Sequence, residues 1–258
     1  MSRNSSFQTH NSSSKQYGYK GKKHHPLRIA AFFVVSSFAV MGALLVILPK
    51  LRSGMQQTFS LHGAAELQLQ QVHVTEAVFK DVPANHQYAN SIEYLKEKGI
   101  IKGFEDKTFQ PDSPITRAEL VKLITDALGA DPHPVSNSYC FKDVTNEWFS
   151  RYVCYAKRSG WVNGRDDGYF EPETDLTKAE ALKIIMNAFR VQLTSETPTQ
   201  IFSDVAADKW YAPYVWTAQI RGYADAGKSP LFHPDETINR GQVADMLARV
   251  LATEKPIF

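Results

Sequence analysis

The sequence predicts a mainly α protein in which three helix-loop-helix repeats pack in a pseudo-threefold arrangement behind one N-terminal transmembrane helix. Two observations carry this prediction: an uncharged apolar run at residues 29–49, and a motif that recurs three times after residue 78. The chain has 258 residues, of which 43% are hydrophobic and 22% are charged. It is therefore long and apolar enough to bury a sizeable core.

The apolar run at residues 29–49 predicts a transmembrane helix that acts as a signal anchor. At about 1.5 Å per residue it can cross a hydrocarbon core of about 30 Å. Residues 1–28 are polar, carry only basic charges and predict a disordered cytoplasmic tail. The positive-inside rule then places the rest of the chain outside the membrane. A cleaved signal peptide is the alternative, although the run is long for one. Residues 50–77 are interpreted as a spacer, and a short helix before the folded part is the alternative for residues 53–77.

The repeats open with the same four-residue pattern, "FKDV", "FKDV" and "FSDV", at residues 79–82, 141–144 and 202–205. Each opening leads to a short helical stretch that ends at a glycine, and ten residues later to an aromatic in an F-x-P triplet. Repeats of this length predict supersecondary units that stack to build a shared core.

A second helix of about twelve residues follows each F-x-P triplet. Each begins at a capping box. The side chain of the N-cap residue accepts the backbone N–H of the residue three positions later, and the side chain of that residue accepts the N-cap N–H. Each also carries one apolar stripe, which needs a partner to be buried. Three copies can pack these stripes against one another. The six capping residues are Thr116, Glu119, Thr177, Glu180, Asn239 and Gln242.

The first repeat, "FKDVPANHQYANSIEYLKEKGIIKGFEDKTFQPDSPITRAELVKLI", resembles an S-layer homology (SLH) motif, and the other two repeats are similar. The resemblance covers residues 78–251, with repeats at 78–130, 140–191 and 201–252. It implies a trimer of motifs around a central three-helix bundle. It also implies binding of secondary cell-wall polysaccharides, often carrying pyruvate ketals, or of other peptidoglycan-linked glycans, in grooves between neighbouring motifs.

A cation occupies the first position of each second helix: Arg117, Lys178 and Arg240. The positive end of the helix dipole disfavours a cation there. A helix start also offers free N–H groups, so a cation beside them makes a site for an anion such as a pyruvate carboxylate. Arginine can grip a carboxylate with two parallel bonds whereas lysine offers a point charge, so the groove at Lys178 is expected to differ. The alternative is that these cations are solvated or paired with acids.

Four further residues are candidates for the glycan site. Trp148 and Trp210 occupy one repeat position, where an indole can stack on a sugar face or can pack in the core. Gly103 and Gly164 match the family's second loop glycine, and either allow close approach of a ligand or form a left-handed turn.

The third repeat departs from the pattern. It has Ala226 in place of the second loop glycine, and Gly241 and Gln242 in place of alanine and glutamate. The groove of the third repeat is therefore expected to be altered or inactive. The first repeat has Gln87 at the tryptophan position, so the sequence does not establish an aromatic for the first groove.

Two sets of residues are expected to have structural roles. Asp81, Asp143 and Asp204 sit in the repeat openings and are expected to hold turns by accepting backbone N–H bonds. Cys140 and Cys154 lie in the second repeat and predict a disulfide in an oxidising compartment. Two cysteines without a paired histidine do not suggest a metal site, and no cofactor is expected.

Composition and motifs argue against several function classes. After residue 79 acidic residues outnumber basic ones, which disfavours nucleic-acid binding. No G-x-S-x-G, H-E-x-x-H or phosphate-binding loop occurs, and no residues remain for a catalytic domain, so an enzyme is not expected. The sequence predicts a glycan-binding protein on the cell-wall side that tethers the membrane to the wall or surface layer. The alternative is a membrane-anchored interaction or assembly subunit that binds another surface-layer or envelope protein.

Overall fold

The computed structural model describes residues 69, 74–133, 140–196, 202–224 and 229–254. The chain divides into two compact units, Met1–Arg52 and Ser53–Phe258, and every described residue lies in the second. The predicted cytoplasmic tail and the predicted transmembrane helix at residues 29–49 lie outside the described residues. Among those described, no helix is both long and apolar enough to span a bilayer.

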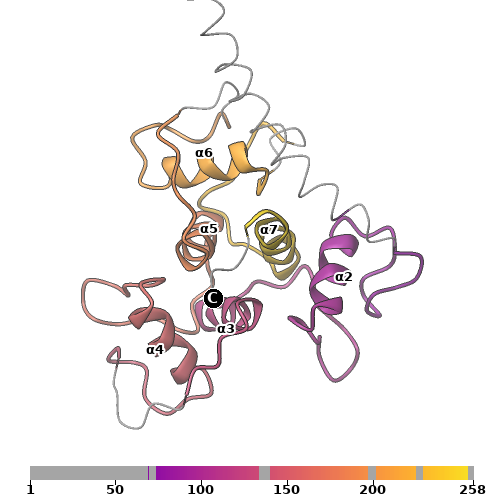
Figure 1. Ribbon diagram of the computed structural model, residues 1–258, viewed down its shortest axis with the longest axis horizontal. Helices are drawn as coiled ribbons and strands as arrows, with labels where there is room; N and C mark the ends of the chain where they lie inside the picture. The colour runs from indigo at the N-terminus through magenta and orange to yellow at the C-terminus, as the bar shows by residue number, and fades with distance from the viewer. Residues whose placement is uncertain (1–68, 70–73, 134–139, 197–201, 225–228, 255–258) are drawn as a thin grey trace, which may run out of the picture. The chain divides into compact units, whose positions relative to one another are not determined.

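The described part of the chain is helical, as the sequence predicts, and each repeat contributes a shorter helix followed by a longer one (Figure 1). The two helices of a repeat are joined by a loop, and the only β-structure among the described residues consists of isolated bridges. In chain order the helices are α2 (Ala89–Glu97), α3 (Arg117–Ala127), α4 (Ser150–Arg158), α5 (Lys178–Ala188), α6 (Ala212–Arg221) and α7 (Arg240–Thr253).

The three longer helices α3, α5 and α7 gather at the middle of this unit, and the shorter ones surround them (Figure 1). Each shorter helix packs mainly on the longer helix of the preceding repeat: α4 on α3, and α6 on α5. The first repeat completes the cycle, because α2 packs on α7 of the third. Each pair of a shorter and a longer helix thus comes from two repeats, and no repeat buries its apolar stripe alone.

The three predicted capping boxes are confirmed. In α3 the Thr116 hydroxyl accepts the Glu119 N–H at 3.3 Å, and the Glu119 carboxylate accepts the Thr116 N–H at 3.0 Å. The same reciprocal pair forms at Thr177 and Glu180. In α7 the pair is Asn239 and Gln242, so an amide performs the same capping as a carboxylate.

The first N–H groups of the central helices are not free, and that part of the anion-site prediction is wrong. They donate to carbonyls of another repeat, in a cycle that joins the first repeat to the second, the second to the third and the third to the first. The bonds are Arg117 N–H to Thr174 O (3.0 Å), Ala118 N–H to Pro172 O (3.0 Å), Lys178 N–H to Glu236 O (2.9 Å), Ala179 N–H to Pro234 O (3.0 Å), Arg240 N–H to Ser113 O (2.9 Å) and Gly241 N–H to Pro111 O (2.8 Å).

The opening aspartates hold the loops, as predicted. Asp143 accepts the N–H groups of Phe170 at 2.8 Å and Glu171 at 2.7 Å. Asp81 and Asp204 make the equivalent pairs of bonds in the other repeats. The second donor has positive φ in each case (59° at Glu171), so the aspartate fixes a turn that an L-residue rarely adopts. The phenylalanine of each F-x-P triplet is thereby held close to the cation that begins a central helix.

The predicted disulfide between Cys140 and Cys154 is confirmed, with a Cα–Cα distance of 5.4 Å and a sequence separation of 14 residues. It ties the start of the second repeat to the buried side of α4. A cross-link of this span restricts the unfolded chain more than the folded one.

We predict that reducing this disulfide lowers the free energy of unfolding by about 3 kcal/mol, since the bond closes a loop of this length. The measurement is urea denaturation of residues 76–258 with and without reductant. The chain has two cysteines in all, so a Cys140→Ser, Cys154→Ser variant is the control and should be insensitive to reductant. Equal stability of the oxidised and reduced forms would contradict the prediction.

Candidate functional site

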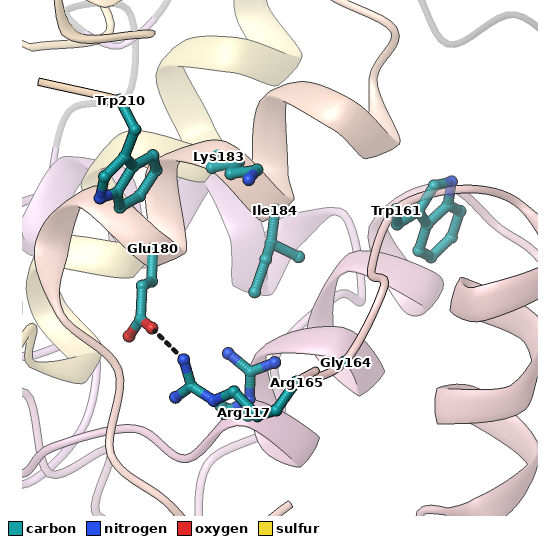
Figure 2. Close-up of a pocket in the computed structure, with 8 residues that line it drawn as sticks. All are labelled: Arg117, Trp161, Gly164, Arg165, Glu180, Lys183, Ile184 and Trp210. Carbon is teal, nitrogen blue, oxygen red and sulfur yellow. Dashed lines mark hydrogen bonds and ion pairs between the residues drawn. The ribbon is translucent and has the colours of Figure 1, made fainter. Parts of the chain in front are cut away.

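A groove of about 280 Å³ lies at the start of α5 and is lined by residues from all three repeats (Figure 2). The first repeat contributes a residue of α3, the second its loop and α5, and the third Trp210, which lies two residues before the start of α6. At one end lie two guanidinium groups, and at the other an indole and a lysine (Figure 2). The lining residues are Arg117, Trp161, Gly164, Arg165, Glu180, Lys183, Ile184 and Trp210.

Arg117 lies at the guanidinium end and is buried, with 6% of its surface exposed. Its Nε donates to the Phe170 carbonyl at 2.9 Å, and its guanidinium carbon lies 4.9 Å from the centre of the Phe170 ring. Within the described residues it forms no ion pair with a carboxylate. Burial, followed by repulsion from Arg165, lowers the pKa of Arg117. A desolvated cation without a counter-ion is costly, and the ring offsets part of that cost.

The other two cations occupy equivalent positions. Arg240 donates from Nε to the Phe109 carbonyl at 3.0 Å, and its guanidinium carbon lies 5.0 Å from the ring centre. The Lys178 ammonium lies 4.6 Å from the centre of the Phe232 ring. Burial lowers the pKa of both groups. Each cation therefore rests on the F-x-P phenylalanine of another repeat, which is a structural reason for its place at the helix start. No described carboxylate pairs with either, so the acid-paired alternative is not supported.

The two candidate tryptophans are not core residues. Trp148 is 55% exposed and Trp210 is 51% exposed. Trp210 lines the groove, and the Lys183 ammonium lies 5.1 Å from the centre of its ring. Trp148 stands at the same repeat position before α4 and does not line this groove. An exposed indole held edge-on by its neighbour, here Tyr211, offers a flat apolar face.

The two loop glycines have a conformational role. Gly103 has φ of 70° and Gly164 has φ of 78°. A Cβ at Gly164 would lie 2.4 Å from the Phe141 ring, and a Cβ at Gly103 would lie 2.4 Å from Phe79. The left-handed turn and the packed ring account for both glycines, and of the two only Gly164 also lines the groove.

Four groove residues were not predicted from the sequence: Trp161, Arg165, Lys183 and Ile184. Aligning the repeats would have drawn attention to Lys183, because Lys122 holds the same place in α3. Arg165 gives no such signal, since the equivalent residue is Phe104. Glu180, predicted as a cap alone, also lines the groove and forms an ion pair with Arg165.

Three residues depart from the repeat pattern at positions equivalent to groove residues Arg117, Trp210 and Lys183. Lys178 replaces the arginine, Gln87 replaces the tryptophan, and Asp245 of α7 stands where α5 has Lys183. Asp245 accepts a hydrogen bond from Ser91 of α2 at 2.6 Å. Gly241 has its own cause, because a Cβ there would lie 2.4 Å from the Tyr88 ring. Ala226 lies outside the described residues.

Comparison with known proteins identifies the class of domain. Residues 78–121 and 141–182 match the family described as S-layer homology domain. The two matched stretches fall in the first and second repeats. The third repeat lies outside this match, although it has the same helix pair, capping box and inter-repeat bonds.

Several curated proteins are similar over the same region. The chain is 26% identical over 172 residues to the S-layer protein Sap of Bacillus anthracis, covering 66% of this chain and 21% of the relative. It is 25% identical over 167 residues to a cellulosome-anchoring protein of Acetivibrio thermocellus, covering 64% and 35%. It is 27% identical over 173 residues to an uncharacterised cell wall amidase of Bacillus anthracis, covering 66% and 31%. The chain thus spans about a fifth to a third of the length of these relatives.

We predict that Gly164→Ala destabilises the domain by about 3 kcal/mol, because the added methyl group must displace the Phe141 ring and sits at positive φ. Gly160→Ala is the matched control. Gly160 has a φ of 76°, but a Cβ there would meet nothing within 4 Å, so the substitution should cost only about 1 kcal/mol. Urea denaturation measures both. Equal losses would mean that the Phe141 contact does not require the glycine.

Proposed function

We propose that this domain binds an anionic cell-wall polysaccharide, or another peptidoglycan-linked glycan, non-covalently in the groove of Figure 2. The observation that carries the proposal is Arg117, a buried cation without a carboxylate partner among the described residues, at one end of a groove. An anionic group on a sugar would supply the missing counter-charge. The proposal extends to Lys178 and Arg240 at the equivalent positions.

The chemistry of the groove suits a charged sugar rather than a bare ion. Arg117 uses its Nε on the Phe170 carbonyl, so its two terminal nitrogens remain to make parallel bonds to a carboxylate. At the other end Trp210 offers an exposed face for the apolar side of a sugar ring. Lys183 beside it can donate to hydroxyl groups. These side chains can bind a sugar. The lining residues include no nucleophile held by a general base.

The relatives support a role at the cell surface. Two of those described above are named as an S-layer protein and a cellulosome-anchoring protein. We propose that the third repeat is a third SLH motif, that the domain lies on the wall side of the membrane, and that residues 29–49 anchor it there. The chain would then tether the membrane to the wall or surface layer. The disulfide fits that side, since such bonds persist in oxidising compartments.

We predict that residues 76–258 co-sediment with cell-wall sacculi of the source bacterium, and that Lys183→Ala combined with Trp210→Ala lowers the affinity at least about tenfold. The two contacts together are expected to contribute about 1.4 kcal/mol or more. Both side chains are partly exposed, so the fold should survive. Trp148→Ala is the comparison variant: it removes an equally exposed indole that does not line this groove, and it tests whether the equivalent repeat position also contributes to binding.

Three outcomes separate the hypotheses. Loss of binding in the double variant alone supports the groove. Equal loss in both variants would place the wall contact elsewhere or spread it over several grooves. Failure of the native domain to sediment would contradict the glycan proposal, and a protein partner would then be the leading alternative.

We also predict that the full chain remains in the membrane pellet after carbonate extraction and that its mass includes residues 1–28. A chain of this kind with an uncleaved apolar segment cannot be released by alkali. Deletion of residues 29–49 should release it and serves as the control. A shortened soluble product from the native gene would show that the segment is a cleaved signal peptide instead.

A further inference from the structure

Arg165 has two carboxylate partners of unequal quality. Its Nε donates to Glu171 at 2.8 Å, and its Nη1 donates to Glu180 at 3.2 Å. Glu171 is on the same loop, six residues away, whereas Glu180 belongs to the first turn of α5 and lines the groove. The two contacts raise the pKa of Arg165, with Glu171 the largest cause. Glu171 therefore holds Arg165 in place, and Glu180 makes the second, longer contact.

Glu180 divides its two oxygens between two tasks. Its Oε2 accepts the Thr177 N–H at 3.1 Å and completes the capping box. Its Oε1 reaches into the groove toward Arg165, which the dashed line in Figure 2 marks. The capping bond does not depend on Oε1, so the contact with Arg165 can open without disturbing the start of α5.

We propose that the Glu180 carboxylate stands in for the ligand's anionic group on Arg165, and that a carboxylate of the wall glycan replaces it when the glycan binds. This inference rests on the proposed glycan-binding function and assigns Arg165 and Glu180 as its specificity-determining pair. The exchange gives Arg117 a counter-charge: the glycan carboxylate accepts from Arg165 and Arg117, while Glu180 gives up its ion pair and keeps the capping bond from the Thr177 N–H.

The exchange makes the groove selective for charged glycans. A neutral sugar would have to leave Glu180 on Arg165 or separate the pair without offering a replacement charge. An anionic sugar also meets Arg117, which the described residues leave without a carboxylate. Since the pair is partly exposed, with 41% of the Arg165 side chain and 22% of the Glu180 side chain accessible, opening it costs little.

The repeats provide matched comparisons for this pair. Glu119 holds the same capping position in α3, but the residue equivalent to Arg165 is Phe104, so Glu119 has its cap and no guanidinium from that position. Gln242 caps α7 through its amide oxygen. A glutamine at position 180 should therefore preserve the helix start while removing the internal competing charge.

The test measures binding of the polysaccharide released from sacculi to residues 76–258 by titration calorimetry. Glu180→Gln is expected to bind about three- to tenfold more tightly than the native domain, because the ligand no longer displaces an ion pair. Glu119→Gln should bind as the native domain does. In an Arg165→Gln background the gain from Glu180→Gln should disappear. Polysaccharide whose carboxyl groups have been converted to methyl amides should bind weakly and not distinguish the variants. Melting temperatures establish that each variant is folded.

Two results would overturn the inference while leaving the proposed function intact: native binding with no gain in Glu180→Gln, or a gain that persists in the Arg165→Gln background. If neither the native domain nor Glu180→Gln binds the polysaccharide, the proposed function and the inference both fail.

Discussion

The structure depends on the hydrogen bonds that begin its three central helices. A helix start leaves N–H groups without intrahelical partners, and here the first two of each central helix donate to the loop after another repeat's F-x-P phenylalanine. Because the bonds run from the first repeat to the second, the second to the third and the third to the first, they form a closed cycle. Isolated β-bridges join the same segments, as between Thr116 and Asp175. The cycle explains why the repeats occur as three and why each shorter helix can pack on a neighbour's longer one.

The same cycle sets the electrostatics of the site. Once carbonyls take up the helix N–H groups, the positive end of the dipole no longer faces an open anion site, and the cation beside it has lost most of its water. Arg117 replaces that water with the Phe170 carbonyl and ring, which are neutral. The cation is therefore held rigidly with its charge unbalanced. Preorganised charge of this kind favours a ligand that brings its own counter-charge, because the protein need not reorganise to bind it.

Sequence reasoning reached the fold because the fold is encoded in local patterns. Thr116 and Glu119 predict a capping box, Asp143 predicts a turn, and the threefold repeat of these signals predicts a shared core. The candidate site could be predicted only in part from the sequence. Arg117 and Trp210 stand out by their repeat positions, but Arg165 matters through an ion pair with Glu180 across 15 residues, and no periodic signal marks it. The assumption of free N–H groups failed because their partners lie in another repeat, more than fifty residues away in sequence.

In the third repeat the N-cap and the cation at the helix start keep the repeat pattern, whereas a residue at a position equivalent to a groove residue does not. This repeat keeps an N-cap in Asn239 and a cation in Arg240, which donates to the Phe109 carbonyl. It differs where α5 presents Lys183, since Asp245 stands there and bonds Ser91. The bonds of the cycle come from the backbone N–H groups of Arg240 and Gly241, and the Asn239 cap supports the same helix start. A change at the position of Asp245 leaves these backbone bonds in place. The geometry thus allows the three grooves to acquire different ligand preferences while the bonds between repeats stay the same.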